Sequence, residues 1–446
     1  MDTNVALRET HSALVGIRVL DFTWSVAGPT ITTILAALGA EVIKVEWPLY
    51  PDMMRQTMFA TGVQPTLDSG CFYASVNPGK LGFSCNVKSD QGQHLIEQLV
   101  PKVDIVTESF SNGVMERWGF GYERLRELRP DIIFLRLCGF GHSGRYASYN
   151  TWGPTAQAFN GLTALSGLPG EAPAGWGFSY MDVMAGYMGA LAALMAIFHR
   201  HKTGEGQYVD MSQVEAGIGL TGAAMLDASA NGSARRSGQP PGNRALWSQR
   251  DADVASRNEF GAPYNCYPTL GNSRFDYCAI SVLNDTQWEA LKMAMGNPPW
   301  ADEERFATSA ARISNQGELD AHLSEWTARY PKFDLMYQLQ QAGVPCGALQ
   351  SMEDLLERDP QLQHREMIVE ADHPLLGRRR WQACPLKLSA SPPVFSPRWP
   401  LFGQDNDYVL REVLGLGPTE IDELNATNAH WPKDFPRDVE VGRALW

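Results

Sequence analysis

The sequence lacks the cysteine and histidine spacings that mark a disulfide framework or a metal site. Its seven cysteines are an odd number, they include no Cys-x-x-Cys pair, and no histidine stands at metal-ligand spacing beside them. We therefore expect no metal in this protein. Free thiols suit a reducing compartment, so we place the chain in the cytoplasm.

The chain also has little that suggests secretion, a membrane or a nucleic acid. Its first residues carry no basic segment before an apolar core, which argues against a signal peptide. The longest apolar stretch, residues 184–198, contains two glycines and is shorter than the ~20 residues of a membrane span, so it predicts a buried helix. The formal net charge is −13 and the cationic residues are scattered, which argues against nucleic acid or an anionic membrane as a partner.

The composition that remains is that of a long globular chain. Its 446 residues exceed the roughly 250 to 300 residues at which one core stops growing, so we expect two domains. We predict a large domain over residues 1–227 that is completed by 385–446, and a small domain over 261–345. A linker over 228–260 and a return linker over 346–384 would join them.

The N-terminal half alternates β-rich runs with helical stretches. Residues 16–22 and 41–46 predict strands, and residues 29–38, closed by Gly39, predict the helix between them. The alternation continues with strands at 103–107, 131–137 and 208–212 and with helices near 91–99 and 123–127. This order predicts an α/β fold, in which the large domain is Rossmann-like with a parallel sheet.

Beyond this half the pattern is less regular. Residues 139–177 are rich in Gly, Pro, Ser and Trp and predict a long irregular segment of the kind that lines sites. A smaller α+β domain is expected from strands at 264–267 and 277–282 and from helices that begin near residues 286, 315 and 333. Irregular chain is expected beyond residue 359, with a closing helix at 406–414.

Residues 139–144, GFGHSG, match the GxGxxG pattern of dinucleotide-binding folds. In a true fingerprint the glycines open a helix whose N-terminus holds the pyrophosphate, but here they lead into RYASYNTWGP, which is not helical. The first β-α turn, TWSVAGP at 23–29, also lacks the required glycines. The pattern therefore gives little support to an NAD-linked oxidoreductase.

Asp182 stands between the irregular segment and the long apolar helix. Position alone favours a helix N-cap, because Asp is a common cap and its carboxylate accepts helix amide hydrogen bonds. A carboxylate can also act as a nucleophile toward an acyl group when it is shielded from water. The neighbouring Trp176, Gly177, Phe178 and Tyr180 would give close backbone approach and a dry wall.

Ordered blocks along nearly the whole chain resemble the class III CoA-transferases. The first is GIRVLDFTWSVAGPTITTILAALGAEVIKVE at 16–46. Others are ESFSNGVMERWGFGYERL at 108–125, HKTGEGQYVDMSQVEAG at 201–217 and AGVPCGALQSMEDLLERDPQL at 342–362. This family, also called the CaiB/BaiF type, includes formyl-CoA transferase, carnitine CoA-transferase and α-methylacyl-CoA racemase.

The resemblance implies a mechanism and an assembly. The family nucleophile matches Asp182, so the cap and catalytic interpretations can both hold. It would carry CoA from an acyl-CoA donor to a carboxylic acid through an aspartyl anhydride and an aspartyl-CoA thioester. CoA is then a substrate and not a resident cofactor. The family also implies an interlocked homodimer, in which each chain forms a ring threaded by the other.

The resemblance also implies a set of CoA contacts, carried over block by block. They are Val26, Ala27, Cys85, Lys88, Ser109, Phe110, Ser111, Arg117, Cys138, Gly139, Phe140 and Gly141. The usual Asn-Phe-Arg of the block at 108–125 is Ser109-Phe110-Ser111 here, and a basic residue that some members have after the second strand is replaced by Trp47-Pro48. Lys88 and Arg117 remain as phosphate partners.

Two alternatives stay open beside the transferase. A racemase needs an acid/base on each face of the α-carbon, and the family's histidine 30 residues before the aspartate is Trp152 in this sequence. The chain could also be an inert subunit of a heteromeric transferase, although the retained Asp182 argues against that. The density of aromatic residues near Asp182 suggests the class of acceptor acid. If they line the pocket, they favour an acid with an apolar or aromatic body over oxalate or formate; they are Trp24, Trp152, Trp176, Phe178 and Tyr180. Gly261 stands where the family has a glycine-rich lid, and the donor could be succinyl-CoA or acetyl-CoA.

Overall fold

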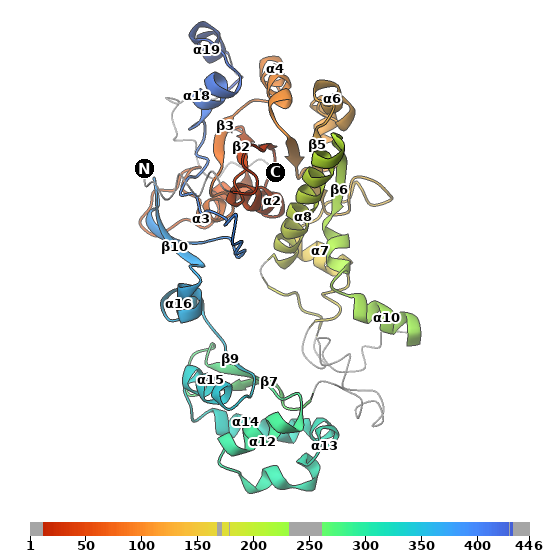
Figure 1. Ribbon diagram of the computed structural model, residues 1–446, viewed down its shortest axis with the longest axis vertical. Coiled ribbons are helices and arrows are strands. Elements are labelled where there is room, and N and C mark those ends of the chain that lie inside the picture. The colour runs from red at the N-terminus through yellow and green to blue at the C-terminus, as the bar shows by residue number, and fades with distance from the viewer. Residues whose placement is uncertain (1–11, 167–171, 178, 232–260, 428, 431–446) are drawn as a thin grey trace. The chain divides into compact units, whose positions relative to one another are not determined.

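The chain forms two compact units, and Figure 1 labels many of their elements. The first unit comprises Met1–Thr163, Gly175–Ala223 and Gln363–Trp446, and the second comprises Ala164–Ala174 and Ala224–Leu362. The computed structural model describes residues 12–166, 172–177, 179–231, 261–427, 429 and 430. The linker predicted for 228–260 therefore lies mostly outside the described residues.

The first unit is built on a six-stranded parallel sheet in the order β3-β2-β1-β4-β5-β6. Its strands are β1 Arg18–Asp21, β2 Glu41–Glu46, β3 Leu81–Ser84, β4 Ile105–Glu108, β5 Ile133–Cys138 and β6 Tyr208–Ser212. The chain builds β1 to β3 in one direction and β4 to β6 in the other, so the strand order reverses between β1 and β4. In open α/β sheets, ligands bind outside the carboxyl ends of the strands at such a reversal.

Successive residues of each strand pack into cores on opposite faces of this sheet. Val19 and Val42 face the core that contains α2 and α8, whereas Leu20 and Ile43 face the core that contains α4, α5 and α6. The helices are α2 Ala27–Ala37, α4 Asp90–Leu99, α5 Val114–Arg117, α6 Tyr122–Leu128 and α8 Tyr180–Thr203. The C-terminal α18 (Asn406–Tyr408), a π-helical turn (Val409–Val413) and α19 (Pro418–Asn425) adjoin the second core. The predicted α/β layering is confirmed.

Helix α8 is 24 residues long and, by length and composition alone, apolar enough to cross a membrane. One of its faces packs against α2 in the core, where glycines let the helices approach closely. A Cβ added to Gly186 would lie 2.5 Å from Thr30 Cβ, and one added to Gly189 would lie 2.4 Å from Ile31 Cδ1. The other face exposes large apolar side chains, namely Tyr187, Met188, Leu191, Met195 and Phe198. The prediction of a buried helix is therefore correct for one face only.

Regular structure also occurs where the sequence predicted irregular chain. The segment 139–177 contains α7, Gly153–Phe159. The chain after residue 359 contains α17, Pro360–His364, and the antiparallel pair β10 (Ile368–His373) and β11 (Gly377–Gln382). The first unit further contains α3, Cys71–Ser75, and α9, Gln213–Ile218.

The second unit is an α+β arrangement, as predicted. Its three-stranded antiparallel sheet has the order β7-β8-β9, from Tyr264–Pro268, Tyr277–Ser281 and Cys346–Ala348. Its own core contains Trp288, Leu291, Phe306 and Leu323. The main helices are α12 Asp285–Ala294, α13 Ser309–Ser314, α14 Gln316–Thr327, α15 Lys332–Gln341 and α16 Met352–Glu357. Helix α10, Gly222–Asn231, contains the boundary between the units in the sequence, which falls between Ala223 and Ala224.

Candidate active site

A cavity of about 560 Å³ opens in the first unit where the strand order reverses. Its wall includes the turn after β1, the turn after β4 and the carboxyl end of β5, together with the start of α8 and Gln213 of α9. The predicted residues in this wall are Trp24, Val26, Ala27, Ser109, Phe110, Ser111, Cys138, Gly139, Trp152 and Asp182. Residues from eight separate stretches of sequence thus line one cavity.

The remaining predicted residues lie elsewhere. Cys85 and Lys88 line a second pocket of about 230 Å³, which shares Trp24 and Phe110 with the cavity. Arg117, Phe140, Gly141 and Tyr180 are outside the described lining of both pockets, and Gly261 belongs to the second unit.

Asp182 lies in the first turn of α8, and its position corrects the N-cap prediction. Ser179 is the N-cap, because the helix begins at Tyr180, and the Asp182 amide donates to the Ser179 carbonyl at 3.0 Å. The Gln213 side-chain amide donates to Asp182 Oδ1. On the other side the backbone of Gly153 approaches so closely that an added Cβ would lie 2.6 Å from Asp182 Oδ2.

The surroundings of Asp182 act on its charge in two directions. Burial raises the pKa of the carboxyl, because the charged form loses its hydration. Hydrogen bonds from Gln213 and Ser179 favour the ionised form and oppose that rise. Both partners are neutral, so the carboxylate is oriented without being neutralised by an ion pair.

The turn after β1 forms one side of the cavity and is tied to two other segments. The Trp24 amide donates to Ser109 Oγ at 2.9 Å, which joins it to the turn after β4. Ser25 has a left-handed backbone with φ of 66°, and its amide donates to both carboxylate oxygens of Asp52 at 3.1 and 3.2 Å. Asp52 also accepts from the Met54 amide at 3.0 Å, so one buried carboxylate connects two parts of the wall.

A network of buried charges lies behind this turn. Lys44 Nζ is 3.8 Å from Asp52 Oδ2 and donates to the Thr23 carbonyl. Arg55 donates to Glu46 at 2.6 Å and pairs with Asp68 at 2.8 Å. Burial, opposed by Lys44, raises the pKa of Asp52 to about 6. The cations of this network are thus engaged by carboxylates within the protein.

A second charged cluster lies behind Cys138. His142 Nε2 is 3.3 Å from Glu108 Oε1, and His142 Nδ1 is 3.2 Å from Asp210 Oδ1. Burial disfavours the imidazolium, but hydrogen bonds with Cys138 and Glu108 raise the pKa of His142 to about 10. Arg136 also pairs with Glu108. These contacts tie the segment after β5 to Glu108 of β4 and Asp210 of β6.

The second pocket is mainly aromatic. Its wall consists of Phe22, Trp24, Val45, Glu46, Trp47, Tyr50, Cys85, Asn86, Val87, Lys88, Phe110 and Trp118. Trp24 and Phe110 meet edge to face with centroids 5.3 Å apart, and Lys88 Nζ lies 4.2 Å from the Tyr50 ring centroid. Aromatic faces beside one cation suit a flat base with a phosphate attached.

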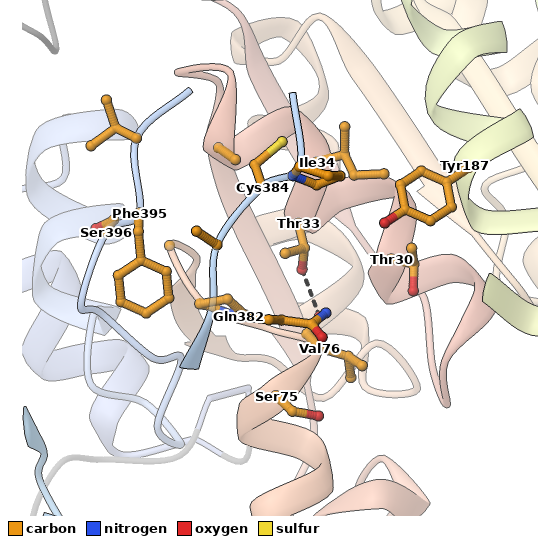
Figure 2. Close-up of a pocket in the computed structure, with 16 residues that line it drawn as sticks. Thr30, Thr33, Ile34, Ser75, Val76, Tyr187, Gln382, Cys384, Phe395 and Ser396 are labelled. Carbon is orange, nitrogen blue, oxygen red and sulfur yellow. Dashed lines mark hydrogen bonds between the residues drawn. The ribbon is translucent and has the colours of Figure 1, made fainter. Parts of the chain in front are cut away.

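A third, smaller pocket of about 70 Å³ lies beside α2 (Figure 2). Figure 2 shows Tyr187 of α8 on one side, and Cys384 and Phe395 of the C-terminal segment on the other. The Thr33 hydroxyl donates to the Val76 carbonyl at 2.6 Å across its floor. Tyr187 also belongs to the exposed apolar face of α8, so the pocket and that face are continuous.

Sequence reasoning missed several residues of the Asp182 environment. Gln213 stands in the block at 201–217 that carried the family resemblance, but nothing in that block showed that it reaches Asp182. Gly153 could have been suspected only because it is a glycine next to an aromatic residue, Trp152, in a segment predicted to be irregular. Asp52 gave no signal, because only the fold brings it under Ser25.

The chain is similar to known proteins over most of its length. Residues 14–406 match the sequence model of CoA-transferase family III. The succinyl-CoA–D-citramalate CoA-transferase of Chloroflexus aurantiacus is 33% identical over 410 residues, which are 92% of this chain and 96% of that relative. The formyl-CoA:oxalate CoA-transferase of Streptomyces coelicolor is 30% identical over 418 residues, with 94% and 99% covered. A CaiB/BaiF family protein from Brucella suis has a solved structure with a TM-score of 0.78 and 27% identity, covering 90% of this chain and 100% of that one.

Proposed function

Because the chain belongs to CoA-transferase family III, and so moves CoA from an acyl-CoA to a carboxylate, we propose that Asp182 is its nucleophile. The observation that carries the proposal is the state of this side chain. It lies in the cavity wall, largely buried, and is held by the neutral donors Gln213 and Ser179. A desolvated, oriented carboxylate is a better nucleophile than one in water.

The proposed reaction has four steps at the cavity. Asp182 attacks the acyl carbonyl of the donor, the C–S bond breaks, and CoA leaves as a thiolate from a mixed anhydride. The thiolate attacks the aspartyl carbonyl, which releases the donor acid and leaves an aspartyl-CoA thioester. The acceptor carboxylate attacks that thioester, and CoA thiolate leaves again. Finally the thiolate attacks the acceptor's acyl carbonyl, which forms the new acyl-CoA and frees Asp182.

Burial protects these intermediates as well as activating the carboxylate. An anhydride or thioester that met bulk water would hydrolyse, and the energy of the thioester would be lost. Gln213 can stay bonded to one oxygen while the other attacks, because it donates to Oδ1 and Gly153 packs against Oδ2. The wall thus holds the side chain in a single orientation.

We place CoA with its thioester beside Asp182 and its adenine in the aromatic pocket. The two pockets share Trp24 and Phe110, so one extended molecule can occupy both. Lys88 stands at the aromatic pocket as a phosphate partner, and the exposed Arg117 is a second candidate. CoA is a substrate in this scheme, and no resident cofactor takes part.

We further propose that the protein is an interlocked homodimer in the cytoplasm. The exposed face of α8 and the pocket of Figure 2 together form an extended apolar surface, which a second copy would cover. A non-catalytic subunit would not need the donors that orient Asp182. The racemase alternative lacks an imidazole, because the described lining of the cavity contains no histidine.

The proposal is tested by trapping the acyl-enzyme. The purified protein is incubated with a panel of acyl-CoA donors that includes acetyl-CoA and succinyl-CoA, then treated with neutral hydroxylamine and digested. Peptide mass spectrometry should find a hydroxamate on Asp182 that depends on acyl-CoA. Asp182→Asn should give no adduct and lower exchange by at least about 1,000-fold while the fold is kept. Modification at another carboxylate with exchange retained in the variant would refute the assignment.

A further inference from the structure

Resting on the proposed function, we propose that the acceptor is a monocarboxylic acid with an apolar body, and that acids with a second carboxylate are rejected. The aromatic residues predicted from sequence suggested the apolar body. The charge distribution around the cavity adds the second half of the proposal. The acceptors in the names of two relatives, citramalate and oxalate, each carry two carboxylates, so the proposed acceptor differs from both.

The described wall of the cavity offers no cation to a second carboxylate. None of its described residues is a lysine, arginine or histidine. Its ionisable side chains in that part are Cys138, Tyr149 and Asp182, of which the aspartate is itself negative. A dicarboxylate would therefore bring a charge into a partly dry site that already holds one.

The buried cations near this wall are paired within the protein, and the exposed Arg117, which reaches Gly113 beside the wall, is the phosphate partner proposed above. Behind the turn after β1, Lys44 is paired with Asp52, and Arg55 with Glu46 and Asp68; these side chains are at most 4% exposed. Freeing either cation for a ligand would leave buried carboxylates without partners, which is costly.

The same holds behind Cys138. Arg136 and His142 both contact Glu108, which is fully buried. Buried ion pairs thus stand behind two parts of the cavity wall, so Lys44, Arg55, Arg136 and His142 are not free to bind a carboxylate of a ligand.

The reacting carboxylate does not need such a cation. Its charge is used up when it attacks the aspartyl-CoA thioester, because the oxygen becomes part of an anhydride. A distal carboxylate would keep its charge through every step. The wall thus disfavours the distal carboxylate, which stays charged, and does not disfavour the reacting carboxylate, which loses its charge.

The wall is well suited to an apolar body. Val26 and Met54 are buried in a small apolar cluster at its edge, and Met53 and Phe72 pack against that cluster. Trp24 adds an aromatic face that is fixed by Phe110. Each methylene of an acid that reaches this surface is expected to raise kcat/KM about fourfold until the surface is covered.

The test compares acids of matched length on the full-length enzyme. Valerate is paired with glutarate and hexanoate with adipate, and new acyl-CoA is measured by mass spectrometry. We expect kcat/KM to be at least about 100-fold higher for each monocarboxylate than for its dicarboxylate. A dicarboxylate that is used as well as its partner, or better, would overturn the inference.

A variant turns the same argument into a gain of function. Met53→Arg places a cation on the wall and should raise the glutarate-to-valerate ratio of kcat/KM at least about tenfold, whereas the uncharged Met53→Gln should not. Asn112→Arg, in an exposed part of the lining, provides a second position if Met53→Arg folds poorly. An unchanged ratio in both folded arginine variants would count against the inference.

The hydroxamate assay separates the two proposals, because trapping of Asp182 needs only a donor. If a hydroxamate forms on Asp182 but the enzyme prefers dicarboxylate acceptors, the proposed acceptor class is wrong and the proposed nucleophile stands. Absence of trapping and of exchange with every acid would reject both.

Discussion

At the scale of single residues, the orientation of the Asp182 side chain depends on contacts with residues that are far from it in the sequence. Its orienting donor, Gln213, is 31 residues away, and Gly153 approaches from the other side. The residue itself could be found from the family resemblance. Its partners could not, because a hydrogen bond between side chains on two helices leaves no periodic pattern. The N-cap prediction failed for a local reason: the helix starts at Tyr180, which gives the cap to Ser179.

Removal of the Gln213 amide should shift the pH dependence of the enzyme. In the proposed mechanism Asp182 attacks only when it is ionised, and burial already raises its pKa, so we expect activity to fall as the pH drops through that pKa. Gln213→Leu removes a bond that favours the ion, and the acidic limb of kcat/KM should move to higher pH. The loss of a hydrogen bond to a charged group should also cost about 10- to 100-fold at the optimum.

A merely structural role of Gln213 would give a different profile. The rate would then fall by the same factor at every pH, and the acidic limb would stay where it is. Gln213→Asn keeps the amide on a shorter side chain. Its acidic limb of kcat/KM should therefore shift less than that of the leucine variant.

Gly153→Ala tests the close approach to the carboxylate. The new Cβ would fall 2.6 Å from Asp182 Oδ2, so the side chain must turn away and exchange should drop at least about tenfold. Gly175→Ala is the matched control, because nothing lies within 4 Å of a Cβ there. Full activity of Gly153→Ala with normal hydroxamate formation would show that the carboxylate does not need this wall.

At the scale of elements, the sheet followed from sequence and much of the remainder did not. The strand predicted at 41–46 is β2 itself, because EVIKVE places three β-branched residues in a short run directly after a helix and its closing glycine. Strand β3 was missed, because LGFS is short and has glycine and serine in place of β-branched residues. The β10–β11 hairpin was missed as well, because its second strand, GRRRWQ, is largely exposed and resembles a solvated loop.

The hairpin contains a group that should make stability depend on pH. His373 is 3% exposed, its Nδ1 accepts from the Leu375 and Leu376 amides, and burial lowers its pKa from 6.5 to about 4, with Asp68 opposing and Arg55 assisting. A depressed folded pKa stabilises the fold above pH 6.5, and that contribution is lost as the pH falls toward 4. The free energy of unfolding should decrease by about 3 kcal/mol over this range from His373 alone.

The readout is the difference between wild type and His373→Asn in denaturant unfolding at several pH values. Asparagine keeps an acceptor near the Nδ1 position but does not titrate. The variant should therefore lose less stability than wild type between neutral pH and pH 4, and parallel curves would argue against a neutral buried imidazole.

At the scale of the whole molecule, the two faces of α8 have different tasks. The glycine-bearing face fixes α2, whose N-terminus begins in the cavity wall, and the opposite face presents five large apolar side chains to solvent. Only the apolar residues on the inner face pack into the core of the chain. The sequence could therefore predict an apolar helix, but could not distinguish its core side from its solvent-exposed apolar side.

Charges on the outer face should separate the subunits. Leu191→Lys combined with Met195→Lys places two cations on a surface that the proposed dimer buries, and light scattering should report a shift from dimer to monomer. Met293→Lys in α12 of the second unit is the control, since that methionine is also 65% exposed but stands outside the apolar face. An unchanged dimer in the double variant would place the subunit contact elsewhere.

The most direct test of the central claim follows an oxygen atom. In the proposed cycle the acceptor carboxylate attacks the aspartyl-CoA thioester, and one acceptor oxygen stays on Asp182 when the new acyl-CoA leaves. We therefore predict that turnover with a heavy-oxygen-labelled acceptor transfers label to the peptide that contains Asp182, only when donor acyl-CoA is present. Complete turnover with no label in that peptide would contradict an aspartyl intermediate at this position.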